Sequence, residues 1–251
     1  MKNVKYLALA TTLVTGLGIG AQGAFAEEVG SYNSKVNIEF APSNEPNKPV
    51  DPENPGGDPT GPNGPVVDDP NQEGTQGPLS IDFASTLKFG NQKITSQDAT
   101  YYAEPQKFED GSDRPNYVQV TDNRGTESGW TLQVKQNAQL TSENKHELDG
   151  ATITVKNAEV YTNSNSPEPS QVESGFTLTP GEAVQVVGAQ DGEGAGTFVY
   201  KFGSTDANNI DKSVELFVPG QTVKYAEKYE TTLTWSLNDV PGNSDENVDG
   251  E

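Results

Sequence analysis

The chain has 251 residues, a formal net charge of −21 at pH 7 and no cysteine. This charge argues against nucleic acid as a partner, because proteins bind it through basic groups that displace counterions. It also opposes direct attraction to any other polyanion. The absence of cysteine excludes disulfides, thiolate nucleophiles and cysteine metal sites.

Residues 1–26 have the pattern of a secretory signal peptide. Lys2 and Lys5 precede an apolar run, and small residues lead to Ala24-Phe25-Ala26, an A-x-A cleavage site. Threonines and glycines interrupt the run, whereas a membrane-spanning helix needs about 20 unbroken apolar residues. We therefore expect a secreted, extracellular protein with no membrane span. An exported chain without cysteine favours a Gram-positive source, and without an L-P-x-T-G motif we expect its surface attachment to be non-covalent.

The N-terminal segment, residues 27–40, contains one predicted strand. Val36, Ile38 and Phe40 alternate with polar residues, which is the period-two pattern of a strand with one apolar face. A lone strand is not stable. We therefore expect this strand to pair with an edge of the downstream domain.

Residues 41–78 read as a Pro/Gly/Asn-rich linker. They contain 10 of the 17 prolines of the chain, mostly in D-P, N-P and G-P pairs. Such a segment cannot bury a core of its own and samples extended and polyproline conformations. We predict a disordered tether.

From residue 79 the pattern changes to short apolar runs separated by Gly, Asn, Asp and Pro. No window has a sustained helical period, and roughly 170 residues suffice for one core. This pattern predicts a mainly β fold, with a single β-sandwich or barrel-like domain over residues 79–251. The predicted strands are 79–83, 117–120, 130–136, 151–160, 176–178, 183–187, 196–202, 213–218 and 228–238.

Two of these strands share a pattern and contain the only tryptophans, Trp130-Thr131-Leu132 and Trp235-Ser236-Leu237. Residues two apart share one face of a strand, so each tryptophan points the same way as its leucine. In one interpretation both faces belong to the core, because tryptophans in alternating apolar runs are usually packed. In the other, one or both indoles lie at a surface where sugar rings stack on them. We expect the two strands to lie near each other in one core.

Two short stretches accompany these motifs. Asp122-Asn123-Arg124-Gly125 precedes the first motif, and Asp239-Val240-Pro241 follows the second. By itself the first stretch predicts a tight turn in which Asp and Asn cap the backbone. Arg124 would then brace a neighbouring carboxylate.

Together these motifs resemble the WxL domain family of Gram-positive surface proteins, over nearly the whole mature chain. The resemblance implies non-covalent attachment to the cell wall, with peptidoglycan as the ligand. It also implies a surface complex with WxL-interacting and sortase-anchored proteins, and binding of host extracellular matrix proteins by some members. The residues that it singles out for binding or as motif are Trp130, Leu132, Trp235, Leu237, Asp122, Arg124, Gly125, Asp239 and Pro241.

Nothing in the sequence singles out a catalytic residue, a metal ligand or a cofactor site. His146 is the only histidine and lies among polar residues, which predicts a solvated loop position, and neither G-x-S-x-G nor H-E-x-x-H occurs. The glycine-rich run 192–196 predicts a flexible loop. A calcium site there or in the acidic tail, residues 245–251, lacks EF-hand spacing.

We therefore expect a non-enzymatic wall-binding module. The first alternative is an adhesin or complex subunit whose main ligand is a protein, such as a host matrix protein or a WxL-interacting protein. The second is a wall hydrolase that acts through two carboxylates, a pair that the sequence does not assign.

Overall fold

The computed structural model describes residues 29–57, 64–68 and 73–240 of the chain. The predicted signal peptide, Pro241 and the acidic tail lie outside the described residues. The chain divides into two units, residues 1–39 and 40–251. The prediction of a mainly β fold is confirmed, since the regular elements of the described residues are all strands.

Three four-stranded antiparallel sheets make up the 40–251 unit. The first sheet consists, in spatial order, of β1 (Leu79–Ala84), β5 (Asn116–Asp122), β13 (Gly196–Phe202) and β9 (Ala158–Thr162). The second sheet consists of β10 (Gln171–Val172), β12 (Ala183–Ala189), β6 (Trp130–Gln136) and β16 (Leu233–Asn238). The third sheet consists of β11 (Phe176–Thr177), β8 (Thr152–Val155), β14 (Val214–Val218) and β2 (Ala99–Tyr102).

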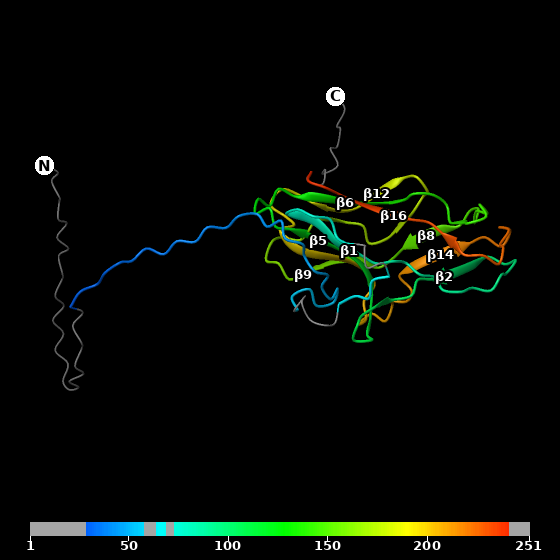
Figure 1. Cartoon of the computed structure of the whole chain (residues 1–251), viewed down its shortest axis with the longest axis horizontal. Coiled ribbons are helices and arrows are strands. Elements are labelled where there is room, and N and C mark those ends of the chain that lie inside the picture. The colour runs from blue at the N-terminus through cyan, green and yellow to red at the C-terminus, as the bar shows by residue number, and fades with distance from the viewer. Residues whose placement is uncertain (1–28, 58–63, 69–72, 241–251) are drawn as a thin grey trace, which may run out of the picture. The chain divides into compact units, whose positions relative to one another are not determined.

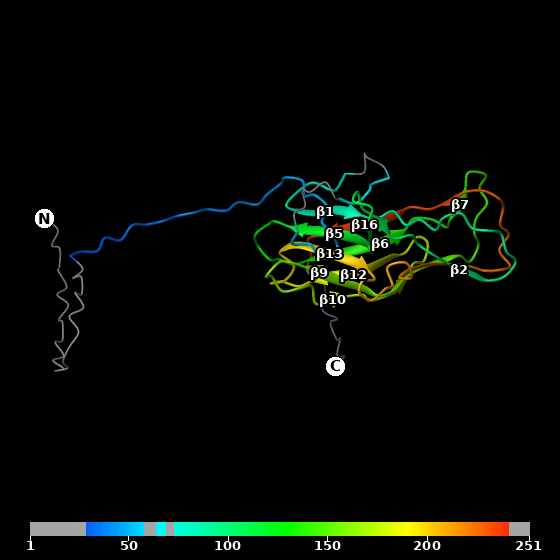
Figure 2. The same ribbon diagram turned by 90° about the horizontal axis from the view of Figure 1, so that it is seen from below.

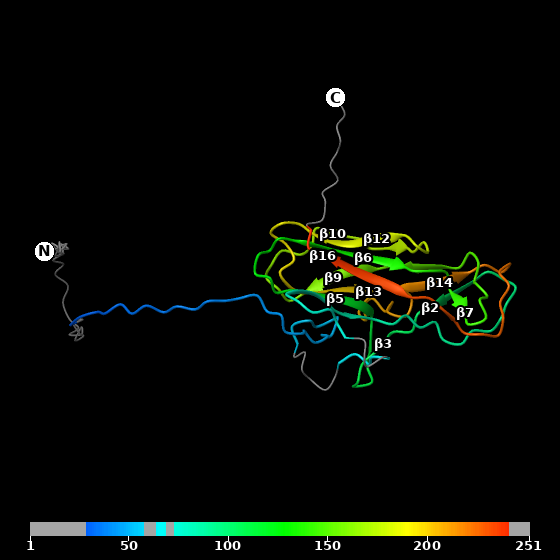
Figure 3. The same ribbon diagram turned by 45° about the horizontal axis from the view of Figure 1, so that its top comes forward.

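Four very short strands complete the unit as two small pairs. They are β3 (Gln106–Lys107) with β4 (Asp113–Arg114), and β7 (Thr141–Ser142) with β15 (Tyr229–Glu230). Figure 1 shows β6, β12 and β16 on one side of the unit and β5 and β9 on the other, with the third sheet towards one end. Figures 2 and 3 show the same arrangement from two further directions.

Aromatic side chains join the first two sheets across the core. Phe198 of β13 packs edge to face on Trp130 of β6, with ring centroids 6.1 Å apart. Phe202, also on β13, stacks with Trp235 of β16 at 6.4 Å. The principal hydrophobic core therefore lies between these sheets and extends into the third sheet through Ile153.

All nine predicted strands correspond to strands of the structure, but two of them are divided. The run 151–160 forms β8 and β9, which belong to different sheets, because the chain turns at Asn157 with φ +51°. Asparagine tolerates this left-handed conformation better than most residues. Likewise, the run 228–238 forms β15 and β16. The sequence did not indicate β2, β3, β4, β7 or β10.

Part of the predicted linker is fixed to the 40–251 unit. Val50 is buried, its N–H donates to Gln119 Oε1 at 2.7 Å, and its carbonyl accepts from the Tyr117 hydroxyl at 2.9 Å. Nearby, Asp51 forms an ion pair with Arg114 at 2.9 Å. This stretch is therefore an ordered part of the fold rather than a free tether, because its one apolar side chain and its backbone polar groups find partners on β5.

The strand expected at residues 36–40 is not formed. Val36, Ile38 and Phe40 are 92%, 78% and 86% exposed, and the described residues 29–40 carry no strand assignment. Period-two alternation makes a segment suitable for a sheet, but a strand forms only where an edge accepts its backbone hydrogen bonds.

Deleting residues 27–45 is expected to change the melting temperature of the mature protein by less than about 2 °C, because surface changes alter stability by only about 0.5 kcal/mol. The matched control is deletion of residues 27–57, which also removes the buried Val50 and should lower the melting temperature clearly. Calorimetry of both variants checks this. An equal loss of stability in both would show that residues 27–45 form part of the folded core.

Candidate functional site

The two tryptophan motifs lie on neighbouring strands. β16 pairs antiparallel with β6, so that Trp235 lies opposite Val134 and Leu237 lies opposite Leu132. Directly opposed residues share a face of the sheet. The motifs therefore present their apolar residues to the same core, as we expected.

Trp130 is a core residue. Only 1% of it is exposed, and its indole Nε1 donates a hydrogen bond to the Gly194 carbonyl at 2.9 Å. Gly194 has φ +82°, and a Cβ there would lie 2.6 Å from the indole nitrogen, so the position requires glycine. Its burial leaves the Trp130 ring no face for a sugar, and the packing interpretation holds for this residue.

The glycine-rich loop that seats this indole is held in place by hydrogen bonds. The Glu193 carboxylate accepts the backbone N–H groups of Ser170 and Gln190 at 2.9 and 2.8 Å. The N–H of Gly192 donates to the Glu127 carbonyl at 2.6 Å. The expectation of a flexible loop is therefore corrected, because the loop closes over the buried end of Trp130.

Asp122 and Arg124 brace the turn that leads into β6. The buried Asp122 carboxylate accepts two hydrogen bonds from the Arg124 guanidinium, at 2.7 and 3.0 Å, and one from the Arg124 backbone N–H at 3.0 Å. The guanidinium also donates to the Gly129 carbonyl at 2.7 Å. The hydrogen bond with Asp122 raises the pKa of Arg124. With Gly125 at φ +73°, these contacts form a structural turn.

The other motif residues divide between core and surface. Leu132 is fully buried, and Leu237 is partly buried against the same core. Asp239 is exposed, and its charge adds to the rise in the pKa of Arg124. Pro241 lies outside the described residues. Hence the described residues of this group, Leu132, Leu237 and Asp239, offer a ligand no aromatic ring.

Trp235 differs from Trp130, because it is only partly buried and borders a cavity. The two tryptophans share a local pattern, but β6 lies between β12 and β16, whereas β16 is an edge strand with one neighbour. A tryptophan on an edge strand lacks cover on one side. The position of the strand within its sheet therefore explains why one indole is enclosed and the other is accessible.

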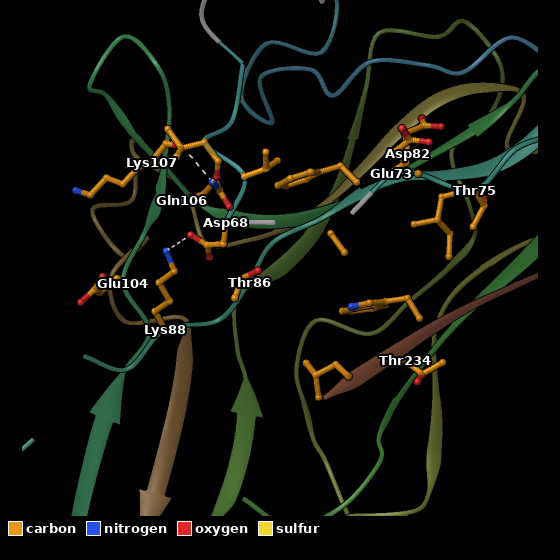
Figure 4. A pocket seen from close by; sticks show the side chains of 18 of the residues that line it. Asp68, Glu73, Thr75, Asp82, Thr86, Lys88, Glu104, Gln106, Lys107 and Thr234 are labelled. Atoms are coloured by element: carbon orange, nitrogen blue, oxygen red, sulfur yellow. Dashed lines mark hydrogen bonds and ion pairs between the residues drawn. The ribbon is translucent and has the colours of Figure 1, made fainter. Parts of the chain in front are cut away.

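The cavity has a volume of about 380 Å³ and lies between β1 and β16. The polar residues of its lining are shown in Figure 4 and are Asp68, Glu73, Thr75, Asp82, Thr86, Lys88, Glu104, Gln106, Lys107 and Thr234. Its apolar residues include Trp235, Leu233 and Phe83. The lining is thus about evenly divided between polar and apolar residues, and it is more polar than that of a typical ligand cavity.

Part of the predicted linker forms one wall of this cavity. Val66 donates its N–H to the Lys107 carbonyl at 2.8 Å, and Thr75 donates its N–H to the Ile81 carbonyl at 2.8 Å. A Cβ on Gly74 would lie 2.7 Å from the Asp82 carbonyl oxygen, so glycine permits this close approach to β1. The sequence gives no sign of this role, because a proline-rich composition indicates only that the segment forms no core of its own.

Asp82 lines the cavity, but its carboxylate is engaged in hydrogen bonds within the protein. Its carboxylate accepts hydrogen bonds from Ser80, Gln119 and Thr121 at 2.6, 2.8 and 2.5 Å. Burial raises the pKa of this carboxyl. Because these contacts join β1 to β5, the Asp82 side chain has a structural role rather than a ligand-binding one.

His146 lies in a loop cluster remote from both motifs in the sequence. Its ring stacks on Tyr225 at 3.8 Å, and its Nδ1 lies 3.0 Å from Glu227 Oε2. Hydrogen bonds to its carboxylate lower the pKa of Glu227 to about 2, and the bond from Ser142 has the largest effect, followed by that from His146. His146 is therefore a partnered residue rather than the simply solvated one that we expected.

No group of three or more histidine and carboxylate side chains is placed to hold a metal ion in the described part of the chain. Among the same residues, no helix has the length and apolar character to cross a membrane.

Comparison with known protein families identifies a match. A family model described as WxL domain, surface cell wall-binding, matches residues 27–241. Neither the curated proteins nor the solved structures that were searched contain a match.

Proposed function

Because the chain belongs to the WxL domain family of surface cell wall-binding domains, we propose that it is a secreted Gram-positive surface protein that binds peptidoglycan non-covalently. The family match over residues 27–241 carries this proposal. The family description names binding to the wall and no reaction. The proposed mechanism is therefore recognition without turnover.

Charge and geometry support a glycan rather than a polyanion as the wall ligand. Removal of the signal peptide with Lys2 and Lys5 would change the net charge from −21 to −23. A protein of this charge repels teichoic acids. The partly exposed Trp235 beside a cavity is the kind of surface on which a neutral sugar can stack.

Co-sedimentation of the mature protein with teichoic-acid-free peptidoglycan tests this function. We expect the protein to remain bound at about 1 M salt. Salt screens attraction between opposite charges, and a polyanionic protein has no such attraction to anionic wall components. Release of the intact, folded protein at high salt would indicate instead that the adhesion is electrostatic. Release of soluble muropeptides would indicate a hydrolase.

A second candidate function is that of a complex subunit that binds another protein, and the N-terminal segment favours it. Val29, Tyr32, Val36, Ile38 and Phe40 are between 78% and 101% exposed. An extended segment with alternating apolar residues suits addition to the sheet edge of a partner. WxL-interacting, sortase-anchored or host matrix proteins, which the family resemblance implies, would be such partners.

The deletion of residues 27–45 separates the two functions. If the segment serves a protein partner, the deleted protein still sediments with peptidoglycan but no longer binds a purified candidate partner in calorimetry. Loss of peptidoglycan binding by the folded deletion variant would instead place the segment in the wall-binding site.

A further inference from the structure

We infer that the cavity between β1 and β16 binds an N-acetylhexosamine unit of a neutral glycan, with the Trp235 indole as its stacking platform. The inference rests on the proposed function and deepens it, because it assigns the wall ligand to one cavity and one class of sugar. It also assigns different roles to the two tryptophans, a core role to Trp130 and a ligand-binding role to Trp235.

The Trp235 ring is held in a defined orientation. Antiparallel pairing of β16 with β6 fixes its backbone opposite Val134, and Phe202 stacks with the indole at an interplanar angle of 19°. The same side chain lines the cavity. A rigid, flat apolar ring with an N–H donor at its edge matches a pyranose, which has an apolar C–H face and polar hydroxyl groups at its rim.

The polar lining suits the hydrogen-bonding groups of such a sugar. Thr86 contributes a hydroxyl group that can both donate and accept, and the Thr75 hydroxyl, which accepts the Ile81 N–H at 2.8 Å, keeps its own proton to donate. The Glu73 and Glu104 carboxylates accept hydrogen bonds, so they match sugar hydroxyls and the N–H of an acetamido group. At about 380 Å³, the cavity is at the small end of ligand sites, which span roughly 300–1,000 Å³. A short saccharide is therefore the appropriate ligand.

The charges of the lining select against a phosphate-containing polymer. Lys88 and Lys107 are the cations of the described lining, and each pairs with an aspartate, Asp68 and Asp113 respectively, at 2.5 Å. Both ammonium groups are thus neutralised within the protein. With the further carboxylates of Glu73 and Glu104, the site is anionic, so a neutral ligand is favoured over a polyanionic one.

The test is calorimetric titration of the mature protein with tri-N-acetylchitotriose, a neutral N-acetylhexosamine trimer without a stem peptide. We expect saturable binding that Trp235→Leu weakens at least about tenfold, because leucine keeps apolar volume but removes the aromatic platform. Thr86→Trp, which adds bulk to the cavity from an exposed position, should weaken binding similarly. Tyr102→Leu, at a partly exposed aromatic residue of β2, is the matched control and should bind like the wild type.

Sedimentation of the same proteins with peptidoglycan distinguishes the possible failures. If the wild type sediments but does not bind the trimer, and both cavity variants sediment like the wild type, the cavity assignment is overturned while the proposed function stands. Binding of a sugar-free stem peptide in the cavity would overturn the sugar assignment. A wild type that does not sediment at all would contradict the proposed function itself.

Discussion

Trp130→Ala is expected to lower the free energy of unfolding by about 3 to 5 kcal/mol. Trp130 is only 1% exposed. The substitution would leave a cavity beside Phe198 and would remove the donor that satisfies the Gly194 carbonyl. Folded domains have a free energy of unfolding of only about 5–15 kcal/mol. The substitution would therefore remove a large part of the stability of the protein. Denaturant titration followed by circular dichroism measures the loss.

Trp235→Ala is the comparison for this prediction. Because Trp235 is only partly buried on an edge strand, its loss should cost less stability than that of Trp130. Wall binding by Trp130→Ala should fail only to the extent that the protein unfolds. Equal stability of Trp130→Ala and the wild type would refute the core role of this indole.

Arg124→Ala is expected to destabilise the fold by about 3 to 5 kcal/mol, as the removal of one partner of a buried ion pair does. The Asp122 side chain is 0% exposed and that of Arg124 only 15%, so the substitution would leave a buried carboxylate without its guanidinium partner. The Gly129 carbonyl would lose a donor as well. Unfolding in denaturant, monitored at several pH values, measures the effect.

Arg114→Ala is the matched control, because Arg114 also pairs with an aspartate. Its pair with Asp51 is more exposed, with side-chain exposures of 24% and 28%. The expected cost is about 1 kcal/mol or less. If the two arginine variants were equally stable, the turn at Asp122 would contribute no more than an ordinary surface ion pair.

The sequence predicted those features of the fold that a local pattern encodes. Alternating apolar residues located the long strands such as β6 and β13, and the matching faces of the two motifs predicted that β6 and β16 lie close together. The short strands, such as β3 and β7, escaped prediction because two residues carry no periodicity. The N-terminal segment shows the reverse case, in which alternation is present and no strand forms.

The cavity could not be predicted from the sequence, because it depends on long-range placement. Its wall comes from residues 66–68 and 73–75, which read as linker, and its platform comes from a strand far along the chain. The difference between Trp130 and Trp235 follows from the order of strands in the sheet. Two similar local sequences therefore acquire different exposures only after the sheet is assembled.

Sedimentation of Trp235→Leu with teichoic-acid-free peptidoglycan, beside the wild type, tests most directly that wall binding depends on Trp235. Thermal melting of the same samples shows whether the variant is folded. We predict that the variant remains folded and binds the wall at least about tenfold more weakly. This corresponds to a loss of about 1.4 kcal/mol or more of binding free energy. A folded Trp235→Leu protein that sediments with the affinity of the wild type would contradict the account.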